Sequence, residues 1–268
     1  MRPPEGFPAG LIQRGAEPKV KIAVCLKRVP DTTSKIVIAA DRASIDEAGL
    51  KFVPNPYDEF ALEAAIALKE KAGAGETVVV ALGGDSVQET LRQGLAMGID
   101  RAVHLQSAGS PDALEVAKVL AAELKEGGYD LILFGKMAVD DYNHAAGPMV
   151  AELLGLPCVT AAVKLEVAGG ALEAEREVEG GVEVLAASLP AVVTCDKGLN
   201  NPRLPALKGI MAAKKKPLDV KPVTLGAAQF SVTGLELPAE RKAGRIVGEG
   251  PDAVAELVSL LRNEAKVI

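Results

Sequence analysis

Short apolar runs alternate with amphipathic stretches of helical length along residues 19–155, and this alternation constrains the fold more than any other feature. Runs such as TVVVAL and DLILFG are rich in Val, Ile and Leu, which is typical of strands buried on both faces of a parallel sheet. Strands that alternate with helices predict βαβ units, and therefore an α/β fold with a mostly parallel, doubly wound sheet. The expected strands are 19–30, 34–40, 77–84, 101–106 and 130–136, and the expected helices are 55–73, 86–98, 111–128 and 142–155.

The pattern changes after Pro157. Residues 158–196 contain three β-like runs separated by Gly-Gly pairs at 169 and 180, which predict an antiparallel meander that returns to the sheet. Residues 218–250 have little periodicity, and an amphipathic helix is expected at 251–267. A long segment of low periodicity followed by a single helix rarely packs on its own domain, so we expect residues 218–268 to wrap around a partner subunit. The predicted organisation is a disordered extension at 1–20, an α/β domain at 21–217 and a C-terminal arm with its helix at 218–268.

The charge distribution argues against nucleic acid as a partner. The 268 residues carry a formal net charge of −6, and five of the positive charges lie within residues 200–217, so the rest of the chain stands at −11. Only 3% of the residues are aromatic and Trp is absent, whereas nucleic-acid binders interleave aromatic side chains with spread basic ones.

The cysteines and the apolar runs exclude further classes. Cys25, Cys158 and Cys195 have no metal-ligand spacing, which indicates a reducing compartment and no metal site. No apolar run approaches the roughly 20 residues of a membrane span, and residues 1–18 lack the features of a signal or transit peptide. The sequence therefore predicts no membrane insertion and a cytoplasmic location in a prokaryote, or the mitochondrial matrix in a eukaryote.

Polar segments follow the expected strands at the sheet edge where open α/β folds bind ligands. These segments are CLKRVPD, VPNPYDE, ALGGDS and FGKMAVDDYNHAAG. The last is the richest, because Gly135 permits close backbone approach, Lys136 supplies a cation, and Asp140 and Asp141 are acceptors. Asp140, Asp141 and Asn143 serve equally well as helix caps. No GxxxxGK[ST] or GxGxxG motif and no nucleophile–base pair occurs, so the edge is suited to a nucleotide that is bound without catalysis.

The segment NNPRLPALKGIMAAKKKP at 200–217 combines five basic residues and no acid with Leu, Ile and Met. It holds too many prolines for a core helix, so we expect a loop that contacts another molecule.

Six motifs together resemble the beta (small) subunit of the electron transfer flavoprotein. They are KRVPD, NPYDEFALEAA, ETLRQGLAMGIDRAVHL, GKMAVDDYNHAAGPMVAELLGLP, EREVEGG and LNNPRLPALKGIMAAKKKP, in this order over about residues 20–217. The resemblance implies an adenine-nucleotide alpha-hydrolase-like fold and a heterodimer with an alpha subunit that holds most of the FAD. It also implies a structural AMP in this subunit and no catalytic residues. The residues that match the AMP site are Cys25, Asn55, Pro56, Tyr57, Asp58, Leu82, Gly135, Lys136, Met137, Ala138, Val139, Asp140, Asp141, Tyr142, Asn143, His144, Ala145 and Ala146. Tyr142, Asn143 and His144 depart from the family's pattern, which leaves the number of polar contacts to AMP open.

The resemblance also assigns the basic segment. It matches a recognition loop (195–217) that docks acyl-CoA and related flavin dehydrogenases of fatty acid beta-oxidation, and the electrons pass on to the electron transfer flavoprotein quinone oxidoreductase. Leu207 corresponds to the anchoring leucine, although Ile210 fits the protein's own core equally well. Glu177 matches an acid that forms an ion pair with the alpha subunit near the flavin. The docking residues that the resemblance implies are Leu207, Lys208, Ile210, Met211, Lys214, Lys215 and Lys216.

Two rival interpretations remain at this stage. In a bifurcating relative, a second FAD replaces AMP and NADH is oxidised in this subunit, and the adenylate half of FAD would need the same strand-end contacts. The other rival is a stand-alone nucleotide-binding sensor or an ATP-using enzyme of the same fold, which leaves the basic segment and the long arm without a role.

Overall fold

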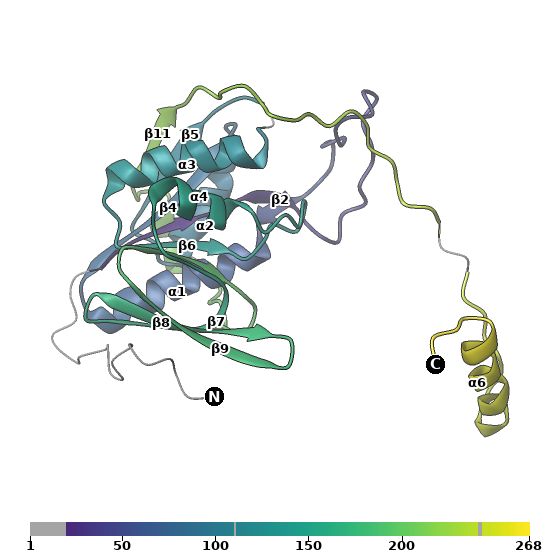
Figure 1. Ribbon diagram of the computed structural model, residues 1–268. Coiled ribbons are helices and arrows are strands. Elements are labelled where there is room, and N and C mark those ends of the chain that lie inside the picture. Colours follow the sequence, from purple (N-terminus) through teal and green to yellow (C-terminus); the bar gives the residue numbers. More distant parts are fainter. Residues whose placement is uncertain (1–19, 110, 241–242) are drawn as a thin grey trace. The chain divides into compact units, whose positions relative to one another are not determined.

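The alternation of strands and helices forms one large sheet in the computed structural model, which describes residues 20–109, 111–240 and 243–268 (Figure 1). Among these residues nine strands pair in the order β11-β5-β4-β1-β6-β10-β7-β8-β9. The described residues form two units that are compact in themselves, one within Val20–Val37 and Asp46–Val232 and the other within Ile38–Ile45 and Thr233–Ile268. The extension expected at 1–20 lies outside the described residues except for Val20.

The parallel part of the sheet confirms the predicted α/β class. Its strands are β1 (Val20–Cys25), β4 (Gly75–Gly83), β5 (Arg101–Gln106), β6 (Leu131–Gly135), β10 (Ala191–Cys195) and β11 (Leu218–Pro222). β1 lies between β4 and β6, and it pairs in parallel with both. The middle residues of β1, β4, β6 and β10 are buried on both faces of the sheet, which explains the continuous apolar sequences of these four strands.

Helices cover both faces of the sheet (Figure 1). The core of one face contains Ile22 and Val24 of β1 and is covered by α1 (Pro56–Ala72) and α2 (Val87–Met97). Ala23 and Cys25 point to the other face, which α3 (Ala113–Gly127) and α4 (Ala146–Leu154) cover. Successive residues of β1 thus serve opposite cores, as the period of a strand requires.

The antiparallel extension follows α4. β7 (Cys158–Ala168), β8 (Ala171–Val178) and β9 (Gly181–Ser188) form two successive hairpins. The third β-like run of the sequence is in fact two strands, because β9 stays at the edge whereas β10 inserts between β6 and β7. The prediction of three runs was therefore one strand short.

Four local predictions need correction. The run 34–40 contains only an isolated bridge between Ile38 and Ile45, while β2 (Arg28–Pro30) pairs instead with β3 (Phe52–Pro54). The helix expected from residue 142 begins at Ala146, because the backbone of the preceding loop turns through positive φ angles. Part of the predicted loop at 200–217 is the helix α5 (Leu207–Ala213). Finally, β11 pairs with β5, so the chain remains part of the sheet beyond the boundary at residue 217 that the sequence suggested.

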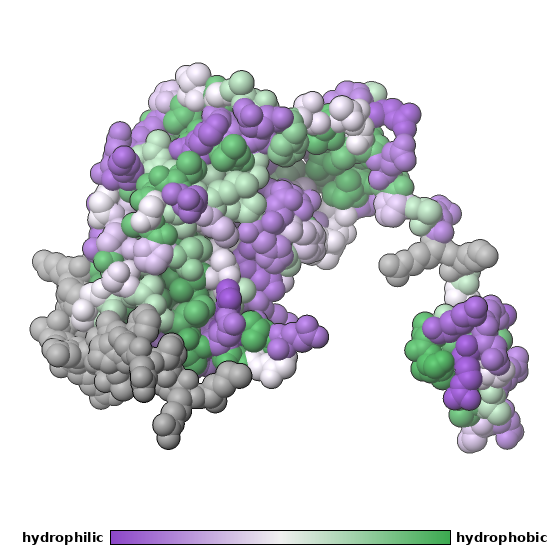
Figure 2. Space-filling view, viewed as in Figure 1, coloured by the Kyte–Doolittle hydropathy of each residue, from purple (hydrophilic) through white to green (hydrophobic). Residues whose placement is uncertain are grey.

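The second unit contains a short 3-10 turn η1 (Pro251–Ala253) and the helix α6 (Val254–Asn263). Within this unit the backbone N–H of Leu235 donates to the carbonyl oxygen of Arg42. Hydrophobic and hydrophilic residues segregate on α6 (Figure 2), and its apolar residues Val254, Leu257 and Val258 are exposed. That this helix contacts an alpha subunit stays a prediction.

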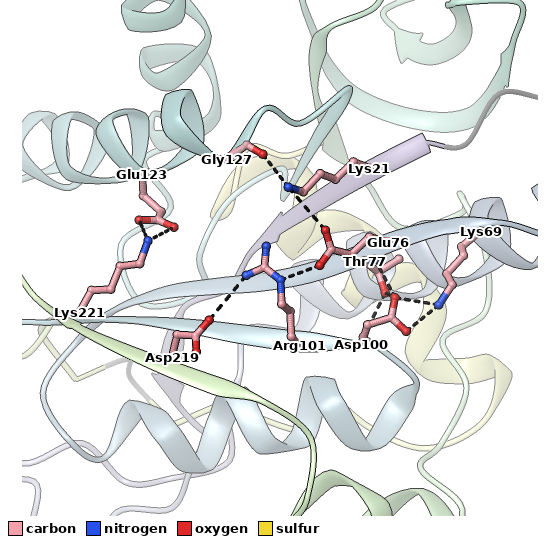
Figure 3. A network of polar contacts seen from close by, with 10 residues as sticks. All are labelled: Lys21, Lys69, Glu76, Thr77, Asp100, Arg101, Glu123, Gly127, Asp219 and Lys221. Atoms are coloured by element: carbon pink, nitrogen blue, oxygen red, sulfur yellow. Dashed lines mark hydrogen bonds and ion pairs between the residues drawn. The ribbon is translucent and has the colours of Figure 1, made fainter.

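Charged residues bind together the amino-terminal ends of the strands (Figure 3). The Glu76 carboxylate of β4 lies 3.5 Å from the ammonium of Lys21 and 2.6 Å from Nε of Arg101. Another guanidinium nitrogen of Arg101 lies 3.9 Å from the Asp219 carboxylate of β11. The ammonium of Lys221 lies 2.7 Å from Glu123 of α3. The contact between Arg101 and Asp219 links β11 to β5, and the contact between Lys221 and Glu123 links β11 to α3.

Within the described ranges, no helix is long and apolar enough to cross a bilayer. The same ranges contain no cluster of three or more His, Cys, Asp or Glu residues that could hold a metal ion.

Candidate functional site

The strand order places a ligand-binding edge at the carboxyl ends of β1 and β6. From β1 the chain continues through α1 to β4 on one side, and it later returns through α3 to β6 on the other side. Connections that leave in opposite directions open a crevice outside the strand ends, where open α/β sheets bind ligands. The segments that the sequence singled out lie at this edge, since they follow β1, β4 and β6 or begin α1.

Asp58 in the first turn of α1 joins three of these segments. Its carboxylate accepts hydrogen bonds from the backbone N–H groups of Lys27 at 2.8 Å and Gly135 at 3.0 Å, and from the side-chain amide of Asn55 at 2.9 Å. The side chain is 5% exposed. Burial raises the pKa of Asp58 to about 7, although these donors and the charge of Lys27 favour the ionised form. Asp58 therefore fixes the spacing between the ends of β1 and β6.

Gly135 is required by close packing at the same point. A Cβ atom there would lie 2.4 Å from Oδ1 of Asp58 and 2.6 Å from the backbone carbonyl carbon of Tyr57. Only glycine lets the end of β6 pass this close to the start of α1. That Gly135 also lies close to a bound nucleotide stays a prediction.

The loop after Gly135 is clamped by a buried amide and a lysine. The Asn55 side chain donates to the carbonyl oxygen of Met137 at 2.8 Å and accepts from the backbone N–H of Val139 at 3.1 Å. Further along the loop, the Lys27 ammonium lies 2.8 Å from Asp140 and 2.9 Å from Asp141. Burial lowers the pKa of Lys27, but its hydrogen bonds to the two carboxylates outweigh that effect and leave the pKa raised. Sequence reasoning left Lys27 out of the candidate site, although it lies in one of the quoted segments.

The acidic residues of this loop do not cap the following helix. The Asp141 carboxylate accepts from the backbone N–H of Asn143 at 3.1 Å, while the N-cap of α4 is Ala145. No described side chain caps α4, and none caps α2, whose N-cap is Ser86. Together with α1, three helices thus begin at the ligand-binding edge without side-chain caps, and uncapped helix starts favour anions such as phosphate. The edge consequently has features that suit a nucleotide phosphate.

The remaining candidate residues differ in how they can contribute. Cys25 is buried at the end of β1, and burial raises the pKa of its thiol, so this side chain packs as a small hydrophobe. The Lys136 ammonium lies 2.9 Å from Asp196 and 5.1 Å from the centre of the Tyr57 ring. Leu82 is half-buried at the end of β4. Pro56, Ala138 and Ala146 are also half-buried, whereas Tyr142, Asn143 and His144 are exposed.

A second candidate region is residues 200–216, which we call the docking segment. Arg203 anchors its first half to α1, with guanidinium contacts of 2.8 Å to Glu63 and 2.7 Å to Glu70. The side-chain amide of Asn200 donates to the carbonyl oxygen of Phe60 at 2.9 Å. Two points of attachment therefore hold this half on the outer surface of α1.

The second half of the docking segment is held by α2. The Lys216 ammonium donates to the carbonyl oxygens of Leu95 at 2.9 Å and Ile99 at 2.5 Å, and burial lowers its pKa. In return, Arg92 of α2 donates to the carbonyl oxygens of Ala213 at 2.6 Å and Lys216 at 2.8 Å. The Lys216 side chain is thus engaged inside the protein and is not presented to a partner, unlike the role that the resemblance implied.

The apolar side chains of the docking segment point outward. Leu207 is 75% exposed, Met211 is 64% exposed and Ile210 is 46% exposed. Lys208, Lys214 and Lys215 are also exposed, so six of the seven residues implied for docking lie on the surface. Ile210 is accordingly not a core residue. The anchoring contacts and the exposed face together form a rigid apolar projection.

Glu177 lies apart from both regions. It is an exposed residue of β8 opposite Val182 of β9. Across the described ranges, its side chain makes no hydrogen bond or ion pair.

Comparisons with known proteins agree with this geometry. Residues 43–225 match the family described as "Electron transfer flavoprotein domain". The chain is 42% identical to the electron transfer flavoprotein subunit beta of Bacillus subtilis, with 93% of this chain and 100% of the relative covered. It is 40% identical to the protein of the same name from Homo sapiens, with 91% and 99% covered. The relative from Bradyrhizobium diazoefficiens is 41% identical, with 93% and 100% covered. The chain therefore belongs to the family of electron transfer flavoprotein beta subunits.

Proposed function

We propose that this chain is the beta subunit of a heterodimeric electron carrier that accepts electrons from flavin dehydrogenases and delivers them to a membrane quinone oxidoreductase. The alpha subunit holds most of the FAD, and the dehydrogenases include those that oxidise acyl-CoA in fatty acid beta-oxidation. Membership of the family supports electron transfer through a partner subunit. The chain contributes binding surfaces and has no catalytic residue of its own.

The observation that carries this proposal is the docking segment. Polar contacts with α1 and α2 hold its backbone, and Leu207 projects from it with three-quarters of its side chain exposed. Leu204, Ile210 and Met211 are exposed on the same segment, and several exposed apolar side chains gathered on one segment are typical of a surface that binds another protein. An electron carrier that must recognise several dehydrogenases gains a rigid anchor that loses little entropy on docking.

We also propose that the edge formed by β1, β4 and β6 holds AMP. Asp58 and Asn55 shape this edge, and the loop from Gly135 to Ala145 would enclose the nucleotide. The uncapped starts of α2 and α4 would supply backbone N–H groups to its phosphate. AMP would supply no redox chemistry there, so its role is structural.

The C-terminal arm and Glu177 would complete the heterodimer. The exposed apolar face of α6 suits burial against the alpha subunit, and Glu177 is available for an ion pair with that subunit near the flavin.

Co-expression with the alpha subunit of the same operon or genome tests the proposal. The purified complex should contain one FAD and release one AMP on acid extraction, whereas the isolated chain should carry no stoichiometric flavin. Release of a second FAD in place of AMP would instead establish a bifurcating carrier. A flavin-saturated isolated chain would contradict the assignment of the FAD to the partner.

A further inference from the structure

A cavity of about 760 Å³ lies between α1, α2 and the docking segment. Ala96 and Met97 of α2 and Ile210 of α5 contribute apolar surface to its walls. Glu59 of α1 and Glu89 of α2 contribute carboxylates. Leu204, which is 91% exposed, also lines the cavity, so the cavity adjoins the apolar face of the docking segment.

The basic residues around the cavity are mostly committed to other contacts. Arg203 faces two carboxylates, those of Glu63 and Glu70, and Arg92 donates to backbone carbonyl oxygens. Lys214 is an exposed residue that also lines the cavity. The lining itself carries two acids, Glu59 and Glu89, and three bases, but the charge of Arg203 is already matched by Glu63 and Glu70 outside the lining.

Glu59 and Glu89 have no cation of their own. In the part of the chain that the structure describes, neither carboxylate has a hydrogen-bond or ion-pair partner. Glu89 is exposed to water, but Glu59 is half-buried, and this burial alone raises its pKa. A half-buried carboxylate without a donor lowers the stability of the free protein. A bound group that supplied a cation would offset this cost.

A long cationic side chain matches both features of the cavity. Lysine and arginine bury an aliphatic stem along apolar surface while their charged end reaches a polar group. Here Ala96, Met97 and Ile210 offer the apolar surface and Glu59 offers the polar end. An uncharged apolar side chain would leave Glu59 without a partner, and an anion would be repelled by it.

We propose that this cavity receives a lysine or arginine side chain of the docked dehydrogenase, next to the site where Leu207 enters the dehydrogenase. The inference rests on the proposed function, because it assumes that the docking segment binds a dehydrogenase. Docking is then reciprocal, with an apolar anchor from this chain and a cationic anchor from the partner. The charge pair adds selectivity to an apolar contact that many proteins could satisfy.

The test uses the co-expressed heterodimer with an acyl-CoA dehydrogenase from the same organism. Glu59→Gln removes the charge at nearly constant volume, Glu59→Arg places a tethered cation in the cavity, and Glu152→Gln neutralises an exposed glutamate of α4 on the opposite face of the sheet. The Michaelis constant and kcat of dehydrogenase-linked flavin reduction are measured at several salt concentrations. Flavin and nucleotide content confirm that each variant assembles.

Glu59→Gln should raise the Michaelis constant for the heterodimer about tenfold and weaken its salt dependence, as expected for loss of a partly desolvated charge pair. Glu59→Arg should raise it further, while kcat and the Glu152→Gln control stay unchanged. Because Glu59 lacks a partner in the free protein, the melting temperature of Glu59→Gln should be equal to or higher than that of the wild type. A purely structural glutamate would show the opposite change in melting temperature.

Three outcomes would overturn the inference. The first is a Michaelis constant within twofold of wild type for both Glu59 variants, and the second is a loss of melting temperature without a docking defect. The third is a defect confined to electron transfer to the quinone oxidoreductase, because the cavity would then bind a side chain of that protein and not of the dehydrogenase. Leu207→Ala, measured in parallel, distinguishes failure of this inference from failure of the proposed function. If Leu207→Ala weakens docking and the Glu59 variants do not, only the role of the cavity is refuted. If neither change weakens docking, the proposed docking function of the segment is refuted as well.

Discussion

Truncation of Leu207 to alanine gives the sharpest test of the docking segment. Complete burial of a leucine side chain is worth about 1.5–3 kcal/mol. Leu207 is 75% exposed in this chain, so a pocket that covers the exposed part would gain about 1–2 kcal/mol from it. Leu207→Ala should therefore weaken docking by roughly 5–30-fold. The free energy of unfolding should change by no more than about 0.5 kcal/mol, as for other exposed positions.

The assay compares dehydrogenase-linked flavin reduction with thermal melting for wild type, Leu207→Ala and Leu62→Ala. Leu62 is fully buried in α1 and serves as the matched control. Its truncation should cost about 2–5 kcal/mol of stability while docking per folded molecule is retained. If Leu207→Ala instead lowered the melting temperature as Leu62→Ala does and left electron transfer per folded molecule intact, Leu207 would be a packing residue and the docking argument would be wrong.

Three further changes probe the anchors of the two regions. Gly135→Ala would place a Cβ 2.4 Å from the Asp58 carboxylate, so we expect a loss of about 1–3 kcal/mol and reduced AMP content, measured by melting and by nucleotide extraction. The folded-state pKa of Asp58 is about 7, against an ordinary value of 3.8, so between these pH values the native protein binds more protons than the unfolded chain. The free energy of unfolding of the wild type should therefore fall as the pH rises from about 4 to 7, and Asp58→Asn should flatten this dependence. Unchanged curves in urea titrations from pH 4 to 8 would refute this. Arg203→Ala leaves Glu63, which is 8% exposed, without its donor and should cost about 1–3 kcal/mol, whereas Arg203→Lys should restore only part of it.

The sequence predicted the parallel core well because its signals are local. Burial on both faces makes the strands around Val24, Val79 and Leu133 continuously apolar, and Pro56 and Gly73 mark the two ends of α1. The sequence of β11 has no continuous apolar run that would predict a strand. Leu218–Pro222 is largely exposed and contains polar residues, and its partner β5 is distant in the sequence.

Sequence reasoning about the sites could single out residues but not the contacts between them. Gly135 follows a strand and precedes a polar loop, so its close approach could be predicted. The pairing of Lys27 with Asp140 and Asp141 joins segments more than a hundred residues apart, and one sequence gives no sign of it. Likewise the run of lysines at 214–216 reads as a uniform basic patch, although Lys216 alone turns inward to the carbonyl oxygens of α2.

The strand order has a consequence for how this protein can change its specificity. The chain leaves the sheet at β10 and re-enters it at β11, which lies five strand positions away, so residues 196–217 must cross roughly 24 Å of sheet at the usual spacing of about 4.8 Å. Both ends of this crossing are fixed by paired strands. A deletion or an insertion between Arg203 and Lys216 would change the spacing of these two anchors, which contact α1 and α2. Evolution can therefore adapt the protein to a new dehydrogenase by exchanging exposed side chains, but hardly by altering the length of the segment that bears them.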